Sequence, residues 1–278
     1  LHTHFTTIST RLRHAPSIYY QIRLFDKFSV GNFKELTKCI CLDNAMMRHL
    51  DGQLNRKGSP NENYAREFLE LYSIGKGPQR GADDYTTYTE LDVVEAAKVF
   101  SGYSIDEEFT NINPELNVSQ ARVRTNDQGL AAQHDSSAKT FSAAFQGASI
   151  APIETVGNLA TAEAAIDEIQ QLVELVFDQE ATALHICRKL YRFFVYYEIS
   201  DEVEQDIIAP LANIFKSNNY ELQAVLEALF TSQHFYDEDN SVNIDDHVGA
   251  IIKSPLDLIV GIHRFFEVPM PNHQSELN

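Results

Sequence analysis

The stretch Ser59-Pro60-Asn61-Glu62-Asn63-Tyr64-Ala65-Arg66-Glu67-Phe68-Leu69-Glu70-Leu71-Tyr72-Ser73 contains the clearest helix signal in the chain. Ser59 can cap the helix, Pro60 suits its first turn, and Glu62 can complete a capping box. We expect this helix to run to about Ser73, with Gly75 ending it in the left-handed conformation.

This helix has a polar face that could carry chemistry. At about 100° per residue, one arc contains Glu62, Asn63, Arg66, Glu67 and Glu70, and apolar side chains fill the other side. Two carboxylates three residues apart can bind a hard cation or divide acid and base roles. The alternative is a solvated face, whose ion pairs contribute only ~0.3–0.5 kcal/mol each.

The two asparagines at the start of this helix favour the site over the solvated face. Asn61 and Asn63 are poor helix formers, so they do not improve a face that merely meets water. We therefore group them with Arg66 as residues that support a site or hold an anion.

Apolar residues at helical spacing predict further helices on both sides of this stretch. In the first of them, near residues 15–26, the spaced positions are Ile18, Tyr19, Ile22 and Phe25. The other expected helices cover residues 33–50, 89–102, 161–176, 184–194, 203–217, 220–233 and 254–266.

The segment 103–160 breaks the helical pattern. It is polar, has no sustained period and shows no β-hairpin signal that we would name. Long irregular segments inside domains tend to be functional or inserted, so we expect a lid or an insertion here. The predicted fold class is all-α: residues 1–278 form one multi-helix, bundle-like domain with a long irregular insertion at 103–160.

Composition excludes several classes of protein. The chain has 278 residues, 44% of them hydrophobic, and 22 Lys and Arg against 40 Asp and Glu give a net charge of −18. This composition is typical of a globular protein, and no apolar run approaches the ~18 residues of a transmembrane segment. The acidic balance argues against nucleic-acid binding and against adhesion to anionic membranes.

The three cysteines, Cys39, Cys41 and Cys187, cannot all pair within the chain. Their spacing lacks a CxxC motif, so we expect buried apolar thiols and no zinc site of their own.

Two histidine-containing motifs are candidates for chemistry. His2 and His4 form an HxH motif, which in an extended segment gives two imidazoles on one side, a workable pair of metal ligands or else a remnant of an expression tag. His134, Asp135 and Lys139 could supply a ligand, a base and an anion anchor, or they could form a polar surface turn.

Arg188 and Arg192 interrupt an apolar helix and share one of its faces. In so acidic a chain we favour internal counter-charges for carboxylates such as Glu67 and Glu70 over a phosphate site. No GxSxG, HExxH, GxGxxG or Walker-type motif occurs, so the common hydrolase, zincin and nucleotide-binding classes lack support.

Several of these segments together resemble a bacterial family known as domain of unknown function 1800. The resemblance rests on Leu1-His2-Thr3-His4-Phe5, Ala45-Met46, Leu50-Asp51-Gly52, Asn61-Glu62-Asn63-Tyr64-Ala65-Arg66-Glu67-Phe68-Leu69-Glu70-Leu71, Gly75, Tyr88-Thr89, Asp92-Val93, Gly102-Tyr103, His134-Asp135, Lys139-Thr140-Phe141, Arg188-Lys189-Leu190, Arg192-Phe193-Phe194, Lys253-Ser254-Pro255 and Gly261. The matching blocks span nearly the whole chain.

The resemblance implies a mostly helical protein, often exported or in the cell envelope, without an established activity. It also implies that the chain is truncated at its N-terminus relative to the family, just before the HxH motif. Two features depart from the family pattern: Tyr103 replaces a frequent Trp, and the segment between Gly102 and His134 is longer and more polar.

The first functional hypothesis is a metal-dependent hydrolase. In it His2, His4, Glu67, Glu70, His134 and Asp135 converge on one centre, with Arg66 or Lys139 orienting an anionic group. Mixed nitrogen and oxygen ligands suit zinc, manganese or iron, and the mechanism would activate a bound water with a spare carboxylate as base.

The alternative is a non-catalytic envelope, assembly or binding module. Its polar residues would form a buried ion-pair network that fixes helix register, with Glu67 or Glu70 paired to Arg188 or Arg192. A protein partner or a polymeric substrate fits this hypothesis, although a carbohydrate-binding module would need exposed aromatic residues. The sequence alone leaves open whether the protein is an enzyme.

Overall fold

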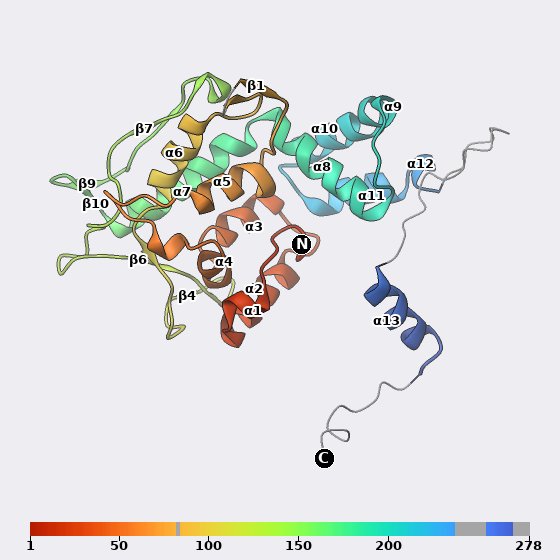
Figure 1. The fold of residues 1–278 in the computed structure, drawn as a ribbon, viewed down its shortest axis with the longest axis horizontal. Coiled ribbons are helices and arrows are strands. Elements are labelled where there is room, and N and C mark those ends of the chain that lie inside the picture. Colours follow the sequence, from red (N-terminus) through yellow and green to blue (C-terminus); the bar gives the residue numbers. More distant parts are fainter. Residues whose placement is uncertain (82–83, 237–253, 269–278) are drawn as a thin grey trace, which may run out of the picture.

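The computed structural model describes residues 1–81, 84–236 and 254–268 (Figure 1). The protein is 52% helical, and a further 12% lies in short strands. It is therefore mostly helical, as predicted, but it is not cleanly all-α. Helices α3 to α7 occupy the middle of the molecule, the strands of the 103–160 segment lie on the left, and α8 to α11 lie on the right (Figure 1).

The expected helix 33–50 is interrupted in the middle. The N-terminal helices are α1 (Ser9–Leu12), α2 (Ala15–Lys27), α3 (Phe33–Ile40) and α4 (Asn44–His49), followed by the 3-10 turn η1 (Gly52–Leu54). The break after α3 follows from Asp43, whose carboxylate accepts the N–H of Met46 at 2.8 Å and thereby starts a new helix.

The buried face of α2 differs from the face that its apolar residues indicate. Tyr19 and Ile22 are 59% and 53% exposed, and the buried positions are Ser17, Gln21, Leu24 and Phe25. A buried hydrogen bond explains this difference. The Gln21 amide donates to buried Asp43 at 2.9 Å, so the Gln21 side of the helix faces the interior.

The helix that contains the two carboxylates begins later than predicted. Ser59 forms an isolated bridge with Arg56, and α5 (Asn63–Glu67) starts where the Asn61 side chain accepts the N–H of Asn63. The last turns are a π-helix, η2 (Phe68–Tyr72), which is rare in proteins and frequent at functional sites. Gly75 ends the helix with φ +77°, as predicted.

The remaining helices confirm the expected pattern. In α6 (Glu90–Val99), Thr89 and Asp92 form a capping box. The C-terminal helices are α7 (Ala162–Phe177), α8 (Glu180–Phe194), α9 (Asp201–Val203), the π-helix η4 (Glu204–Ile208), α10 (Ala209–Ser217), α11 (Leu222–Phe230), α12 (Gln233–Tyr236) and α13 (Pro255–Phe265). Lys253, from the family resemblance, lies outside the described residues.

Short antiparallel strand pairs interrupt the segment that was expected to be irregular, most of which lies in turns and loops. Before it, β1 (Gln79–Gly81) pairs with β2 (Asp84–Tyr85). Within it the pairs are β3 (Tyr103–Ser104) with β6 (Arg122–Val123), β4 (Ile112–Asn113) with β5 (Val118–Ser119), β7 (Lys139–Thr140) with β8 (Ser149–Ile150), and β9 (Thr155–Val156) with β10 (Leu159–Ala160), and the 3-10 turn η3 (Ala143–Phe145) separates β7 from β8.

A turn signal for one of these hairpins was present in the sequence. Gly157-Asn158 separates β9 from β10, and Gly157 has φ +64°. A two-residue glycine-containing loop between short apolar runs is a hairpin pattern, so the expectation of no hairpin signal was wrong.

The 103–160 segment is attached to α6 by carboxylates of that helix. Asp92 accepts both the N–H and the hydroxyl of Ser142 at 2.7 Å, and Glu95 accepts the N–H of Thr140 at 3.2 Å. The capping residue of α6 therefore also holds the chain that follows β7.

The cysteines follow the expectation of apolar thiols. All three are free; Cys41 and Cys187 are buried and Cys39 is partly buried. Within residues 1–81, 84–236 and 254–268, helices that combine the length and the apolar content of a membrane span are absent.

The burial of Asp43 predicts how the stability of the fold changes with pH. Burial raises its pKa to about 7, against hydrogen bonds from Met46 and Gln21 that favour the carboxylate. Because the folded-state pKa lies above the unfolded value of ~3.9, the stabilising contribution is complete below that value and is lost as pH rises through about 7.

We therefore expect D43N to become more stable relative to the wild type between pH 5 and pH 8, by about 1 kcal/mol or more, because asparagine cannot ionise and still caps α4. Urea unfolding at four pH values measures this difference, with D26N on the exposed side of α2 as the charge-removal control. A difference between D43N and wild type that is constant across this range would contradict the assignment.

Candidate functional site

Three ionisable side chains meet in the interior between the 103–160 segment and α7. His134, Lys139 and Glu168 all have zero exposure. His134 Nε2 lies 2.5 Å from Glu168 Oε2, and Lys139 Nζ lies 2.6 Å from both Glu168 oxygens. We call these three residues the buried network.

Backbone carbonyls complete the hydrogen bonding of the network. His134 Nδ1 lies 2.8 Å from the Ser101 carbonyl, and Lys139 Nζ lies 2.5 Å from the Asp135 carbonyl. Because carbonyls only accept, Nδ1 of His134 must carry a proton. A second proton must lie between Nε2 and Glu168, since a bare nitrogen lone pair would repel a carboxylate. Burial lowers the pKa of Lys139, although Glu168 opposes this shift.

Gly102 lets the chain after α6 pass close to the backbone of His134, beside the buried network. Gly102 has φ +83°, and a Cβ atom there would lie 2.5 Å from the backbone N of His134. Above the network, the Tyr103 hydroxyl donates to the Ala165 carbonyl at 2.6 Å and its ring packs edge-on against His134. The tyrosine at this position therefore connects the start of the 103–160 segment to α7.

Asp135 takes part through its backbone and not through its carboxylate. Its N–H donates to the Ser101 hydroxyl at 2.8 Å, and its carboxylate accepts the N–H and hydroxyl of Ser137. Partial burial alone would raise the pKa of Asp135, but the two Ser137 bonds together with the charges of Lys139 and Lys57 outweigh it, and the pKa is lowered. The structure thus brings His134, Asp135 and Lys139 together, and the surface-turn alternative for His134 is wrong.

The two carboxylates of α5 and η2 lie elsewhere. Glu70 is paired with the Lys76 ammonium at 3.2 Å and accepts the Tyr88 hydroxyl at 3.1 Å. Glu67 is half-buried, and desolvation followed by repulsion from Glu70 raises its pKa. Both side chains are partly shielded from water, but their partners come from the β1–β2 region and not from the buried network.

The other polar residues of this helix have structural partners. Arg66 forms a bidentate pair with Glu90 at 2.6 and 2.7 Å, and this pair raises the pKa of Arg66. Asn63 donates to the Leu50 carbonyl at 3.0 Å, and Asn61 organises the turn before α5. These bonds explain why residues of low helix propensity stand at this position.

The histidines of the N-terminal motif separate from each other. His2 is exposed and packs edge-on against Phe25. His4 Nε2 lies 3.0 Å from the Tyr72 carbonyl, and its Nδ1 lies 3.3 Å from Lys189 Nζ. Burial, followed by the charge of Lys189, lowers the pKa of His4 well below its usual value.

Arg188 is a counter-charge for a carboxylate, as expected, but the pairing of the α8 arginines with Glu67 or Glu70 that the binding-module hypothesis predicted was wrong. Arg188 pairs with Glu204 of η4 at 2.5 Å, and Arg192 Nε donates to the Tyr197 carbonyl at 3.2 Å. Both acceptors lie closer along the chain than Glu67 and Glu70 do: Glu204 is in η4, and Tyr197 follows the end of α8.

The predicted convergence of His2, His4, Glu67, Glu70 and His134 is not present. Throughout the described part of the chain, no group of three or more His, Cys, Asp or Glu side chains is placed to hold a metal ion. Both ring nitrogens of His134 and of His4 already have partners, and Glu70 is paired, so these donors are committed to the fold.

Sequence reasoning missed Glu168, the centre of the network. It lies on the buried side of α7 with Ala165, Ile169 and Leu172. A carboxylate within an apolar stripe is almost never buried without a partner, so this position carried a readable signal.

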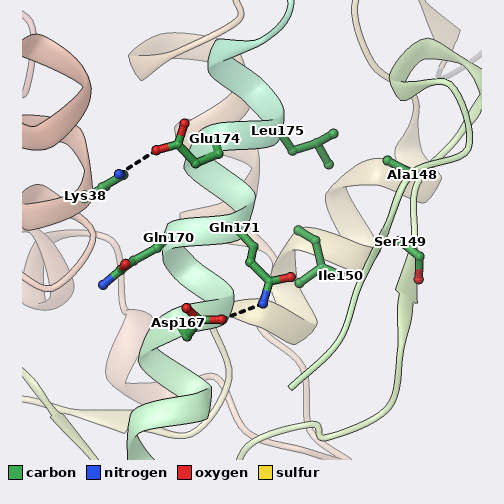
Figure 2. Close-up of a pocket in the computed structure, with 9 residues that line it drawn as sticks. All are labelled: Lys38, Ala148, Ser149, Ile150, Asp167, Gln170, Gln171, Glu174 and Leu175. Atoms are coloured by element: carbon green, nitrogen blue, oxygen red, sulfur yellow. Dashed lines mark hydrogen bonds and ion pairs between the residues drawn. The ribbon is translucent and has the colours of Figure 1, made fainter. Parts of the chain in front are cut away.

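A shallow groove of about 380 Å³ lies on the other side of α7 (Figure 2). Its lining residues are mostly of polar types and come from α3, α7 and the β8 region. Lys38 pairs with Glu174 at 2.6 Å, and the Gln171 amide donates to Asp167 at 2.6 Å (Figure 2). These side chains are mutually bonded, so the groove does not present a set of converging reactive groups.

Fold and network together define a mostly helical protein in which a hairpin-rich segment is fastened to the helical core by a buried ionic cluster. The chain belongs to the family described as protein of unknown function (DUF1800), which matches residues 1–278. No curated protein and no solved structure shows a significant match to it.

The network can be tested by its stability. K139M leaves the buried Glu168 carboxylate without its ammonium partner, so we expect a loss of about 3–5 kcal/mol in the free energy of unfolding. The double variant K139M/E168M should recover at least ~1 kcal/mol of this loss, because both charges are gone. Chemical denaturation measures both, and K76M, which breaks an exposed pair, should cost at most ~1 kcal/mol. A K139M cost no larger than that of K76M would refute the network.

The close approach at Gly102 gives a second prediction. G129A replaces a glycine of φ +76° in open space and reports the backbone cost alone, about 1–2 kcal/mol. G102A adds a clash with the His134 backbone, so we expect at least ~2 kcal/mol of further destabilisation. Equal losses in thermal or chemical unfolding would show that the close approach at Gly102 does not matter.

Proposed function

We propose that the protein is a non-catalytic binding or assembly module, in which the buried network locks the 103–160 segment to the helical core as a fixed surface. The observation that carries this proposal is the complete enclosure of His134, Lys139 and Glu168. A catalytic base or nucleophile must reach its substrate, whereas the hydrogen bonds of these groups go to one another and to backbone carbonyls.

The alternative, a metal-dependent hydrolase, has less support from the geometry. It requires imidazole and carboxylate donors around one open position, together with a concave pocket. Among the candidate donors, His4, Glu70 and His134 instead each have a different partner within the fold.

Helix α13 supports a binding role. It has 11 residues, and its apolar side chains, among them Leu256, Ile259 and Phe265, are 70%, 53% and 80% exposed. A helix this short is marginal in water by itself, and an amphipathic helix is stabilised by covering its apolar face. We therefore propose a macromolecular partner, a protein or a polymer, and, from the family resemblance, an exported location.

The experiment combines elemental analysis with sedimentation. Untagged protein purified from cells at its natural level should contain less than about 0.1 equivalents of zinc, manganese or iron, and it should sediment as a complex larger than one copy of its own polypeptide, as sized by denaturing electrophoresis. Fractionation of the same cells tests the proposed exported location.

Each result has a defined meaning. If the protein held a stoichiometric transition metal, and E67Q or E70Q lost both this metal and an enzymatic activity, the binding-module proposal would be contradicted and the hydrolase alternative supported. A metal-free protein that sediments as a monomer under all these conditions would contradict assembly.

A further inference from the structure

The buried network holds an amine against a carboxyl group. Lys139 Nζ lies 2.6 Å from each oxygen of Glu168, and both side chains have zero exposure. A nitrogen so close to both oxygens is also within the ~3–3.5 Å of a near-attack geometry from the carboxyl carbon between them. The two groups that condense to an amide are therefore already in contact.

The protons of the network leave one positive charge without a partner. Protons on both ring nitrogens of His134 and an ammonium on Lys139 give two positive charges, against the single carboxylate of Glu168. Burial penalises an unbalanced charge, so the loss of one proton is favoured. The nearby carboxylates, those of Glu168, Asp135 and Glu95, oppose that loss. Burial outweighs them and lowers the pKa of Lys139.

The neutral form of the network contains the reactants of a condensation. Lys139 becomes a free amine, and one of its N–H groups still binds the Asp135 carbonyl at 2.5 Å, so its lone pair can face Glu168. The proton shared by His134 Nε2 and Glu168 Oε2, which lie 2.5 Å apart, turns the carboxylate into a carboxylic acid. An amine lone pair can attack a carboxylic acid, whereas an ammonium has no lone pair with which to attack.

We propose that Lys139 and Glu168 form an intramolecular isopeptide bond, which joins the 103–160 segment covalently to α7. The enclosure that keeps outside substrates away from the network favours this reaction, because both partners belong to the chain and bulk water, which would reverse the condensation, is excluded. Fixed contact between two such groups corresponds to an effective concentration of roughly 10⁵ M or more. The step occurs once in each chain, so it goes beyond the proposed module without making it an enzyme.

The step balances without any further reactant. The Lys139 Nζ lone pair attacks the Glu168 carboxyl carbon, so a C–N bond forms and Oε1 takes the electron pair displaced from the C=O bond. One amine proton passes from Nζ to Oε2, which lies 2.6 Å away, and His134 Nε2 supplies the second proton of that oxygen. The C–Oε2 bond then breaks and the C=O bond forms again. The products are one amide and one water.

A second pair of lysine and glutamate provides an internal comparison. Lys38 Nζ lies 2.6 Å from Glu174 Oε1, the same separation as in the buried network, but the two side chains are 18% and 44% exposed. Partial burial is outweighed there by the bonds to Glu174 and Glu35, which raise the pKa of Lys38, in the opposite direction from Lys139. We therefore expect this half-exposed pair to remain ionic.

Peptide mass spectrometry of the trypsin-digested wild-type protein tests the proposal. Lys139 is the only Lys or Arg between Arg124 and Arg188, so an unlinked chain gives the peptides 125–139 and 140–188. An amide at Nζ blocks cleavage after Lys139, so we expect a single peptide, 125–188, that is about 18 Da lighter than its sequence because one water is lost. Fragmentation should place the link between Lys139 and Glu168, and Lys38 should be cleaved as usual.

Two variants test the chemistry of the step. K139R keeps a positive charge beside Glu168, but a guanidinium stays protonated and has no lone pair for the attack, so the two separate peptides should appear. H134Q keeps an N–H donor beside Glu168 but has no acidic proton to give. In pulse-labelled cells its linked fraction should therefore grow at least ~tenfold more slowly than in the wild type. Circular dichroism checks that both variants are folded.

Wild-type protein that yields the peptides 125–139 and 140–188 at their sequence masses would overturn the proposal, and this result requires no variant to fold. A link that forms in H134Q at the wild-type rate would overturn the step as written. A link between Lys38 and Glu174 in the same digest would contradict the argument from burial. Peptide masses report neither metal content nor assembly, so this proposal and the proposed function can fail separately.

Discussion

The constraint on which the rest of the structure depends is the burial of one carboxylate, that of Glu168, on a helix that otherwise presents apolar side chains to the core. A buried carboxylate is strongly unfavourable unless charged or hydrogen-bonding partners reach it. Here the partners, His134 and Lys139, come from the 103–160 segment. That segment must therefore pack against α7 in a single register, which explains how short strand pairs with little core of their own hold a defined position.

The same logic extends outward from the network. Tyr103 and Gly102 bring the chain after α6 against the backbone of His134, and Asp92 and Glu95 of α6 hold the chain beyond Lys139. The hydrogen bonds among these contacts each join α6 or α7 to the 103–160 segment. Polar bonds and apolar packing thus act together, because Phe141, Phe145 and Ile150 of this segment belong to the same apolar core as the helices.

The protein separates its ionisable residues into two settings that have different consequences. The buried network is internally satisfied and contacts no solvent, so its role is to position the chain. The ion pairs of Lys76 with Glu70 and of Arg188 with Glu204 are partly open to solvent, so each contributes less to the fold than the buried network. The burial of these groups, and not their number, decides how strongly they constrain the fold.

The sequence by itself determined the helices, because capping residues and apolar spacing act within a few residues: Thr89 and Asp92 begin α6, and Gly75 ends η2, as their chemistry requires. It also identified His134, Asp135 and Lys139 as a unit. Only the tertiary structure decided their partner, because Glu168 lies 29 and 34 positions away from Lys139 and His134, and no local rule sets such a pairing. For the same reason the assignment of His4, Glu70 and Arg188 to separate neighbours was beyond sequence reasoning, since each choice depends on which segments the packed helices bring within reach.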